Sequence, residues 1–253
     1  MSILGCPAAL NSFPYVHNSA AMNEYLSLNV SDGTQMRMYV SRPISAGPAP
    51  GMIVFQEAYG VNAHIRDVAD RFAREGYLAV APEMYHRTGP GFEGDYKDFQ
   101  GLQKHFGALT EGGADADIRA SYDWLSGNSS VDPNRIACVG FCMGGRFAFQ
   151  ANSIVPMRAA ISFYGGGIAD TLLGRVPQLH GPALLFWGGR DARITPEKIR
   201  AVVDALRASG KVYTSVEFSQ AGHGFFCDAR DVYHKESAEQ AWSLLLNFLK
   251  EHC

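Results

Sequence analysis

The sequence predicts an α/β fold, with a mostly parallel central sheet and helices on both of its faces. Short apolar runs recur along the chain, amphipathic helical segments separate them, and no linker of disordered composition interrupts the alternation. A short apolar run with polar or glycine borders indicates a strand buried on both faces, as in a parallel sheet. Strands that alternate with helices indicate βαβ units. We therefore expect one α/β domain over residues 23–253, after an irregular arm at residues 1–22.

The individual elements follow from the same patterns. Ile65, Val68, Ala69 and Phe72 recur at helical spacing, and Gly76 ends this predicted helix. The stretch 43–51 holds three prolines and two glycines and is predicted to be a loop. We expect strands at 25–30 and 36–42, joined by a Ser31-Asp32-Gly33 turn, and further strands at 52–55, 77–81, 135–139, 159–164, 183–187 and 212–218. Helices are expected at 64–75, 95–109, 114–125, 144–155, 196–208 and 232–249.

Composition and charge exclude several classes of protein. Of the 253 residues, 47% are hydrophobic and 19% are charged, which is typical of a globular protein with a substantial core. Lys and Arg number 22 and Asp and Glu number 25, and this near-balance argues against a nucleic-acid partner. No apolar run approaches the ~20 residues of a membrane span. We expect a soluble protein with no membrane and no nucleic-acid partner.

The cysteines indicate a reducing compartment. There are five, at positions 6, 138, 142, 227 and 253, and none forms a C-x-x-C pair. This odd number and wide spacing argue against a disulfide framework and against a cysteine-based zinc site. We expect a cytoplasmic protein that needs no metal ion and no organic cofactor.

The strongest local signal is Val139-Gly140-Phe141-Cys142-Met143-Gly144-Gly145, where a predicted strand ends and a predicted helix begins. It is the nucleophile-elbow pattern with cysteine in place of serine. Glycines two positions before and after the cysteine leave room for a tight, strained turn. The first N–H groups of the helix favour a thiolate at Cys142. A small buried core residue is the alternative interpretation of Cys142, and it is the one we favour for Cys138.

A cysteine nucleophile needs a base, and the base needs an orienting partner. His223 lies between two glycines after the strand at 212–218, and Asp191 follows the strand at 183–187. All three residues thus follow the carboxyl ends of strands, where open α/β sheets build their sites. Considered alone, Asp191 would be interpreted as a turn residue, and His223 would have no assigned role. Their order along the chain is that of the α/β-hydrolase fold, which favours a Cys142–His223–Asp191 triad.

These motifs resemble those of the dienelactone hydrolases, or carboxymethylenebutenolidases. The resemblance extends from about Met52 to the C-terminus, roughly four-fifths of the chain. It is carried by Gln56-Glu57-Ala58-Tyr59-Gly60-Val61-Asn62, Ala81-Pro82-Glu83-Met84-Tyr85-His86-Arg87, Gly140-Phe141-Cys142-Met143-Gly144-Gly145 and Gly222-His223-Gly224-Phe225. It implies an α/β-hydrolase fold that opens lactones or activated esters without a cofactor.

The resemblance also implies roles for further residues. Glu57 matches a family glutamate beside the resting thiol that takes the thiol proton when substrate binds. Arg87 matches an arginine that grips the substrate carboxylate, and Tyr85, in the same motif, is a second substrate-binding candidate. The structural alternatives are a surface carboxylate at a strand end for Glu57 and an exposed, solvated arginine for Arg87. The backbone N–H groups of Met143 and Ala58 are expected to form the oxyanion hole.

One position departs from the family pattern. Many relatives carry a second carboxylate-binding arginine four residues after the catalytic histidine. This position is Cys227 here, and the nearest arginine is Arg230, three residues further on.

We expect Cys142 to attack a small-molecule lactone or activated ester and His223 to activate the water that hydrolyses the resulting thioester. The protein is expected to be a monomer, with a dimer as the alternative. Three other interpretations remain open: an esterase or thioesterase of this fold with a different substrate, a non-catalytic thiol sensor, and a flavodoxin-like thiol enzyme. Flavodoxin-like thiol enzymes usually carry an acidic residue two positions after the histidine, where this sequence has Phe225.

Overall fold

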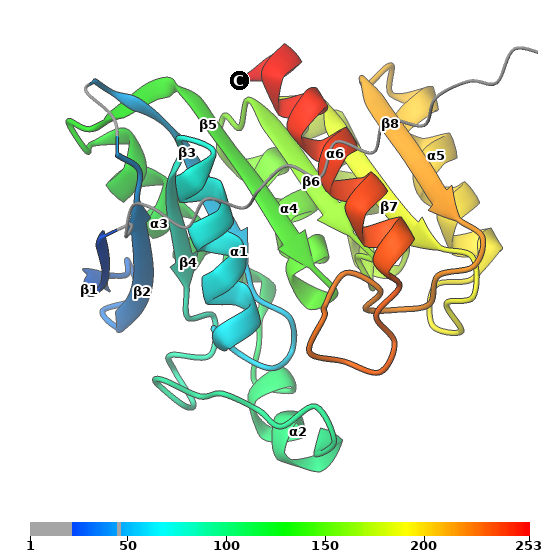
Figure 1. Cartoon of the computed structure of the whole chain (residues 1–253), viewed down its shortest axis with the longest axis horizontal. Coiled ribbons are helices and arrows are strands. Elements are labelled where there is room, and N and C mark those ends of the chain that lie inside the picture. The colour runs from blue at the N-terminus through cyan, green and yellow to red at the C-terminus, as the bar shows by residue number, and fades with distance from the viewer. Residues whose placement is uncertain (1–21, 45–46) are drawn as a thin grey trace, which may run out of the picture.

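The computed structural model describes residues 22–44 and 47–253, and a sheet of eight strands forms its centre (Figure 1). The strands lie in the order β1-β2-β4-β3-β5-β6-β7-β8. The first two pairs, β1 with β2 and β2 with β4, are antiparallel, and all later pairs are parallel. Their bounds are β1 (Met22–Asn29), β2 (Gln35–Arg42), β3 (Ala49–Phe55), β4 (Leu78–Pro82), β5 (Val131–Phe141), β6 (Ala159–Phe163), β7 (Ala183–Gly188) and β8 (Tyr213–Phe218).

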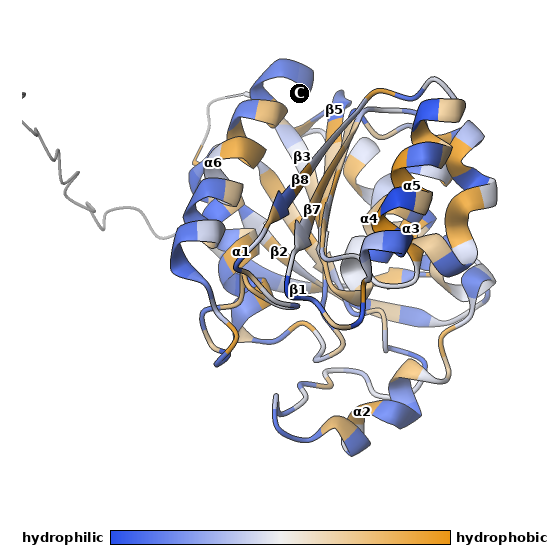
Figure 2. Ribbon diagram, turned by 90° about the vertical axis from the view of Figure 1, so that its right-hand side faces the viewer, coloured by the Kyte–Doolittle hydropathy of each residue, from blue (hydrophilic) through white to orange (hydrophobic). Residues whose placement is uncertain are grey.

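Helices cover both faces of the sheet (Figure 2). On one face lie α1 (Ala63–Arg74) and α6 (Lys235–His252), and on the other lie α3 (Glu111–Ser126), α4 (Met143–Ile154) and α5 (Pro196–Ala208). The short helix α2 (Phe99–Phe106) lies apart from these layers, below the sheet in both views. The predicted α/β class, the mostly parallel sheet and the two helical layers are all confirmed.

The central strands are buried on both faces, as the apolar runs predict. In β3, Met52 and Val54 belong to one apolar cluster of the core, whereas Ile53 and Phe55 belong to another. This alternation places successive side chains on opposite sides of the sheet. The four predicted apolar residues of α1 are buried, and the Asn62 side chain accepts a hydrogen bond from the Ile65 N–H at the start of that helix.

Several predicted boundaries were wrong for local reasons. The helix predicted at 95–109 begins only at Phe99, because the Asp98 carboxylate accepts the Gly101 N–H and caps it there. The helix predicted from 232 begins at Lys235, where His234 caps the Ser237 N–H. Strand β5 is longer than expected at both ends. A π-helical turn at Ile168–Leu172 and a 3₁₀ turn at Leu173–Gln178 were not predicted.

Residues 1–21 of the expected arm lie outside the described residues, and Met22 begins β1. Among the described residues, none of the helices has the length and apolar character needed to cross a bilayer.

Candidate active site

The backbone at Cys142 is held in a rare conformation. This residue joins β5 to α4 with φ 56° and ψ −117°, and it is one of two non-glycine residues with positive φ among those described. Such geometry costs of order 1–3 kcal/mol and persists only where surrounding packing enforces it. No side chain caps the start of α4, so no side-chain acceptor competes with the cysteine for the partial positive charge of its first N–H groups.

Two glycines make this turn possible. A Cβ atom on Gly140 would overlap the carbonyl oxygen of Gly144, and a Cβ atom on Gly144 would overlap the carbonyl oxygen of Phe55. Only glycine therefore allows β5, the start of α4 and the end of β3 to approach so closely. This is the steric reason that the sequence pattern predicts for the spacing.

His223 and Asp191 meet beside this turn. The Nδ1 atom of His223 lies 2.7 Å from Oδ2 of Asp191, whose other oxygen accepts the N–H groups of Arg193 at 2.8 Å and Ile194 at 3.2 Å. Asp191 is thereby fixed by three hydrogen bonds, and it can hold the imidazole in one orientation. The Nε2 atom of His223 has no hydrogen-bond partner among the described residues, so it remains available to the thiol and to substrate.

The charges of this pair reinforce each other. Burial alone would raise the pKa of Asp191, but the hydrogen bond and positive charge of His223 outweigh burial and lower it. Burial alone would lower the pKa of His223, but Asp191 and the Cys142 sulfur outweigh it and raise this pKa to about 9. The site thus stabilises a protonated His223 next to the cysteine.

A pocket of about 710 Å³ brings the predicted residues together. Cys142, His223, Ala58 and Met143 all line it, whereas Asp191 lies behind His223. The rest of the lining comes mainly from α2 and from the segment after β6, with one residue each from α4 and from the loop after β7, and much of it is apolar. These residues are Phe99, Leu102, Gln103, Phe106, Gly107, Arg146, Gly166, Gly167, Asp170, Thr171 and Arg193.

Tyr85 braces the two residues expected to form the oxyanion hole. Its hydroxyl donates to the carbonyl oxygen of Ala58 at 3.1 Å and lies 3.5 Å from Sδ of Met143. The side chain is almost completely buried and is absent from the pocket lining. The structure therefore places Tyr85 behind the pocket wall; direct contact with substrate stays a prediction.

Glu57 is buried near His223 and Arg230 and is not a surface carboxylate. It is 0% exposed, and its Oε1 atom lies 3.3 Å from Nη1 of Arg230. Burial raises the pKa of Glu57, although the charges of Arg230 and His223 oppose this. The Arg230 guanidinium also lies over the rings of Tyr59 and Tyr96, at 5.4 and 5.6 Å from their centroids. The arginine that the sequence places after Cys227 thus reaches the site.

Arg87 does not line the pocket. Its guanidinium donates two hydrogen bonds of 2.8 Å to the fully buried carboxylate of Asp117 in α3 and a third to Asp32. These bonds connect the turn between β1 and β2 to α3. The guanidinium is engaged by two carboxylates, so the solvated alternative does not describe it, whereas contact with substrate stays a prediction. In the structure Arg87 links Asp32 to Asp117. Sequence analysis did not reveal this link because both partners lie far from Arg87 along the chain.

Sequence analysis missed two features of the region. One is the contribution of α2 to the pocket, which depends on how a loop folds back over the sheet. The other is a buried group formed by Glu57, His64 and Cys227, whose ligand atoms all lie within 4.8 Å of one another. This group of possible metal ligands cannot be recognised from spacing in the sequence, because its members come from three separate segments.

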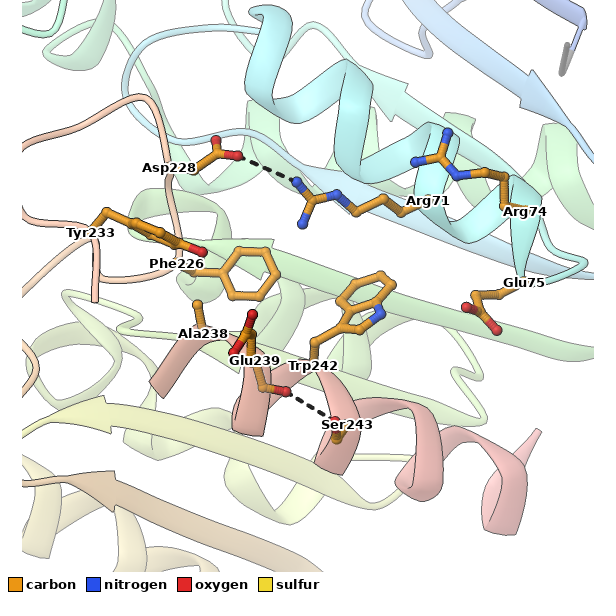
Figure 3. Close-up of a pocket in the computed structure, with 10 residues that line it drawn as sticks. All are labelled: Arg71, Arg74, Glu75, Phe226, Asp228, Tyr233, Ala238, Glu239, Trp242 and Ser243. Carbon is orange, nitrogen blue, oxygen red and sulfur yellow. Dashed lines mark hydrogen bonds and ion pairs between the residues drawn. The ribbon is translucent and has the colours of Figure 1, made fainter. Parts of the chain in front are cut away.

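A second hollow, of about 400 Å³, lies between α1 and α6 (Figure 3). Arg71, Asp228 and Trp242 are among its lining residues, and none of the predicted site residues is. Asp228 lies at one end of this groove, where it pairs with Arg71 at 3.6 Å. We therefore assign the candidate active site to the apolar pocket above Cys142.

Known proteins resemble most of this chain. The model of the dienelactone hydrolase family matches residues 36–253. The chain belongs to this family. An Escherichia coli K12 protein provisionally named a carboxymethylenebutenolidase is 37% identical over 235 residues, which cover 88% of this chain and 84% of that protein. A provisionally assigned dienelactone hydrolase from Klebsiella pneumoniae has a crystal structure that superposes with a TM-score of 0.84 at 32% identity, covering 92% of this chain and 99% of that chain.

Membership of the dienelactone hydrolase family makes this chain a hydrolase that acts on ester or lactone bonds of small molecules. It also establishes the α/β-hydrolase fold and excludes the flavodoxin-like alternative.

Replacing Arg87 by alanine is expected to destabilise this hydrolase by about 2–3 kcal/mol, because the buried Asp117 carboxylate loses its bidentate partner and keeps only His86. The free energy of unfolding in urea measures the effect. Arg119→Ala, at an exposed position of α3, is the matched control and is expected to change stability by less than about 0.5 kcal/mol. If Arg87→Ala had unchanged stability and a raised KM, Arg87 would instead be a substrate-binding residue.

The protonation of His223 can be measured directly by NMR with labelled histidine. We expect a pKa raised from 6.5 to about 9 in the intact protein and a clearly lower pKa in Asp191→Asn, where burial dominates. Because the folded-state pKa is the higher one, this group's contribution to stability is complete below pH 6.5 and is lost as the pH rises through about 9. A pKa that does not change on removing the Asp191 charge would contradict the proposed coupling.

Proposed function

We propose that this chain hydrolyses lactones or activated esters by nucleophilic catalysis, with Cys142 as nucleophile, His223 as acid and base, and Asp191 as the orienting carboxylate. One observation carries the proposal: the strained elbow at Cys142 opens into the same pocket as His223, whose other nitrogen is bonded to Asp191 at 2.7 Å. Nucleophile, base and orienter are thus arranged as covalent acyl transfer requires.

The first half-reaction forms a thioester. The Cys142 thiolate adds to the carbonyl carbon, and the oxyanion is held by the N–H groups of Met143 and Ala58. When the tetrahedral adduct collapses, the carbon–oxygen bond of the leaving group breaks, and the leaving oxygen takes a proton from Nε2 of His223. In a lactone this oxygen stays attached to the acyl group. A pKa of about 9 suits His223 to holding this proton until that step.

The second half-reaction releases the acid. Neutral His223 accepts a proton from water, the resulting hydroxide adds to the thioester carbonyl, and the carbon–sulfur bond breaks to restore the thiolate. Asp191 stabilises the imidazolium in both half-reactions and keeps its own charge. The Cys142 thiolate is itself a good leaving group. The tetrahedral adduct therefore collapses to the thioester only when the substrate's leaving group departs at least as easily as the thiolate, which favours enol lactones, aryl esters and thioesters.

Glu57 is proposed to take the proton of the resting thiol. Its complete burial raises its pKa and so makes a protonated state accessible, while the ion pair with Arg230 stabilises the charged state. A carboxyl group balanced between these two influences can exchange a proton as substrate enters.

The lining of the pocket supports a substrate with an apolar body. Phe99, Leu102 and Phe106 of α2 face the pocket. With Arg87 bound to Asp117, the cations nearest to a substrate carboxylate are Arg146 and Arg193, which line the pocket, and Arg230, which lies over the ring of Tyr59. The dienelactone of the family name is therefore one substrate to test, and neutral aryl esters are the alternative.

The proposal is tested by kinetics on cis-dienelactone and on 4-nitrophenyl acetate. Cys142→Ala is expected to lower kcat/KM by at least about 10³-fold on any substrate turned over, since the acyl-enzyme cannot form. Asp191→Asn is expected to lower kcat by up to about 10⁴-fold. Cys253→Ala removes a thiol far from the pocket and serves as the matched control, with activity retained.

Full esterase activity of a purified Cys142→Ala protein would reject the cysteine mechanism. Turnover of the aryl ester without turnover of the lactone would keep the triad and direct the substrate search to neutral or bulkier esters.

A further inference from the structure

Behind the active site, three buried side chains that could each bind a metal ion meet at one point. Glu57 comes from the end of β3, His64 from the first turn of α1, and Cys227 from the loop that follows His223. One carboxylate oxygen, one ring nitrogen and the sulfur all lie within 4.8 Å of one another. The proposed mechanism uses Glu57, but it gives no task to His64 or Cys227.

Within the described part of the chain, three polar atoms of this group lack hydrogen bonds, whereas the Cys227 thiol donates to the Tyr96 hydroxyl at 3.3 Å and Oε1 of Glu57 accepts from Arg230. The His64 side chain is 1% exposed, and neither of its ring nitrogens has a hydrogen-bond partner among the described residues. The Oε2 atom of Glu57 is buried and unpartnered as well. Leaving a buried polar group unsatisfied costs about 1–3 kcal/mol, so several such atoms facing one another point to a missing partner.

We propose that Glu57, His64 and Cys227 form a binding site for one divalent cation of the Zn²⁺ class. A carboxylate, an imidazole and a thiolate are the ligand types that zinc combines, whereas Mg²⁺ and Ca²⁺ prefer sites made of oxygen alone. Tetrahedral zinc at 2.0–2.3 Å from its ligands places them roughly 3.5 Å apart. The observed separation of up to 4.8 Å therefore closes by about 1 Å through side-chain rotation.

The charges around the site both favour and limit binding. Burial lowers the pKa of His64 to about 4, so its ring is neutral and free to coordinate at neutral pH. Burial raises the pKa of the Cys227 thiol to about 11, so a bound cation must displace its proton. Arg230 occupies Oε1 of Glu57 at 3.3 Å but leaves Oε2 free. The nearby guanidinium repels a cation, which predicts reversible binding instead of a permanent structural metal.

A fourth ligand and a route to solvent lie close by. The Oδ1 atom of Asp228 is 3.7 Å from Nδ1 of His64, and its side chain is 55% exposed. Asp228 also lines the groove between α1 and α6 (Figure 3). A cation that enters this groove meets the Asp228 carboxylate, which lies next to His64. Asp228 or a water molecule completes the tetrahedron.

Binding of the cation has a consequence for catalysis that rests on the proposed function. A metal ion that holds the Glu57 carboxylate prevents it from accepting the thiol proton. The site therefore makes hydrolysis reversibly sensitive to a zinc-class cation without the cation touching Cys142.

Titration of the chelator-treated, full-length protein with Co²⁺ tests the site directly. We expect one equivalent to bind with a thiolate-to-cobalt charge-transfer band in the near ultraviolet. Cys227→Ser should abolish this band, while Cys142→Ala and the control Cys253→Ala should keep it. Absence of the band in the unmodified protein would overturn the proposal. So would a band that is lost in Cys142→Ala and kept in Cys227→Ser, which would place the metal on the active-site thiol.

Inhibition by Zn²⁺ tests the consequence separately. In His64→Asn we expect the inhibition constant to rise at least about tenfold, measured against the metal-free rate of the same variant. If this variant does not fold, Cys227→Ser provides the same comparison. Cobalt binding at Cys227 without zinc inhibition would uphold the site and contradict the role of Glu57.

Discussion

The close approach of β3, β5 and α4 around Cys142 is the constraint on which the rest of the site depends. The carbonyl oxygens of Phe55 and Gly144 lie where Cβ atoms of Gly144 and Gly140 would be. Because glycine alone fits there, α4 can start directly at the end of β5, and Cys142 is forced to φ 56°. The strain holds the sulfur at the uncapped start of a helix and aims it into the pocket. Parallel strands β7 and β8 then bring Asp191 and His223 to the same edge of the sheet.

Proton transfer in the site depends on two carboxylates whose surroundings shift their pKa values in opposite directions. Asp191 accepts three hydrogen bonds and faces His223, so its pKa is lowered and it stays charged. Glu57 is fully buried, and its pKa is raised even though Arg230 pairs with it. Groups whose pKa values are driven apart in this way can divide the work of proton transfer. One carboxylate holds the base in place, while the other is able to gain and lose a proton.

The sequence predicted those parts of the site that follow from local pattern. Cys142, Asp191 and His223 each come directly after a strand, and parallel strands gather such residues at one edge. Arg87 shows where this reasoning ends: its partners Asp32 and Asp117 lie 55 and 30 residues away, and only the tertiary fold brings them to its guanidinium. The same applies to Arg230, which reaches Glu57 across 173 residues, and to His64 with Cys227. The apolar residues of α2 could be recognised as helical, but not as a wall of the pocket.

The measurement that tests the central claim most directly is peptide-mapping mass spectrometry of protein quenched in acid during turnover of an aryl ester. Our account predicts an acyl group on the peptide that contains Cys142, attached through a thioester that hydroxylamine removes. It also predicts accumulation of this adduct when His223 is replaced by asparagine, because the water that releases the acid is no longer activated. An enzyme that turns over the ester with the acyl group on another residue, or with no covalent adduct in either protein, would contradict the account.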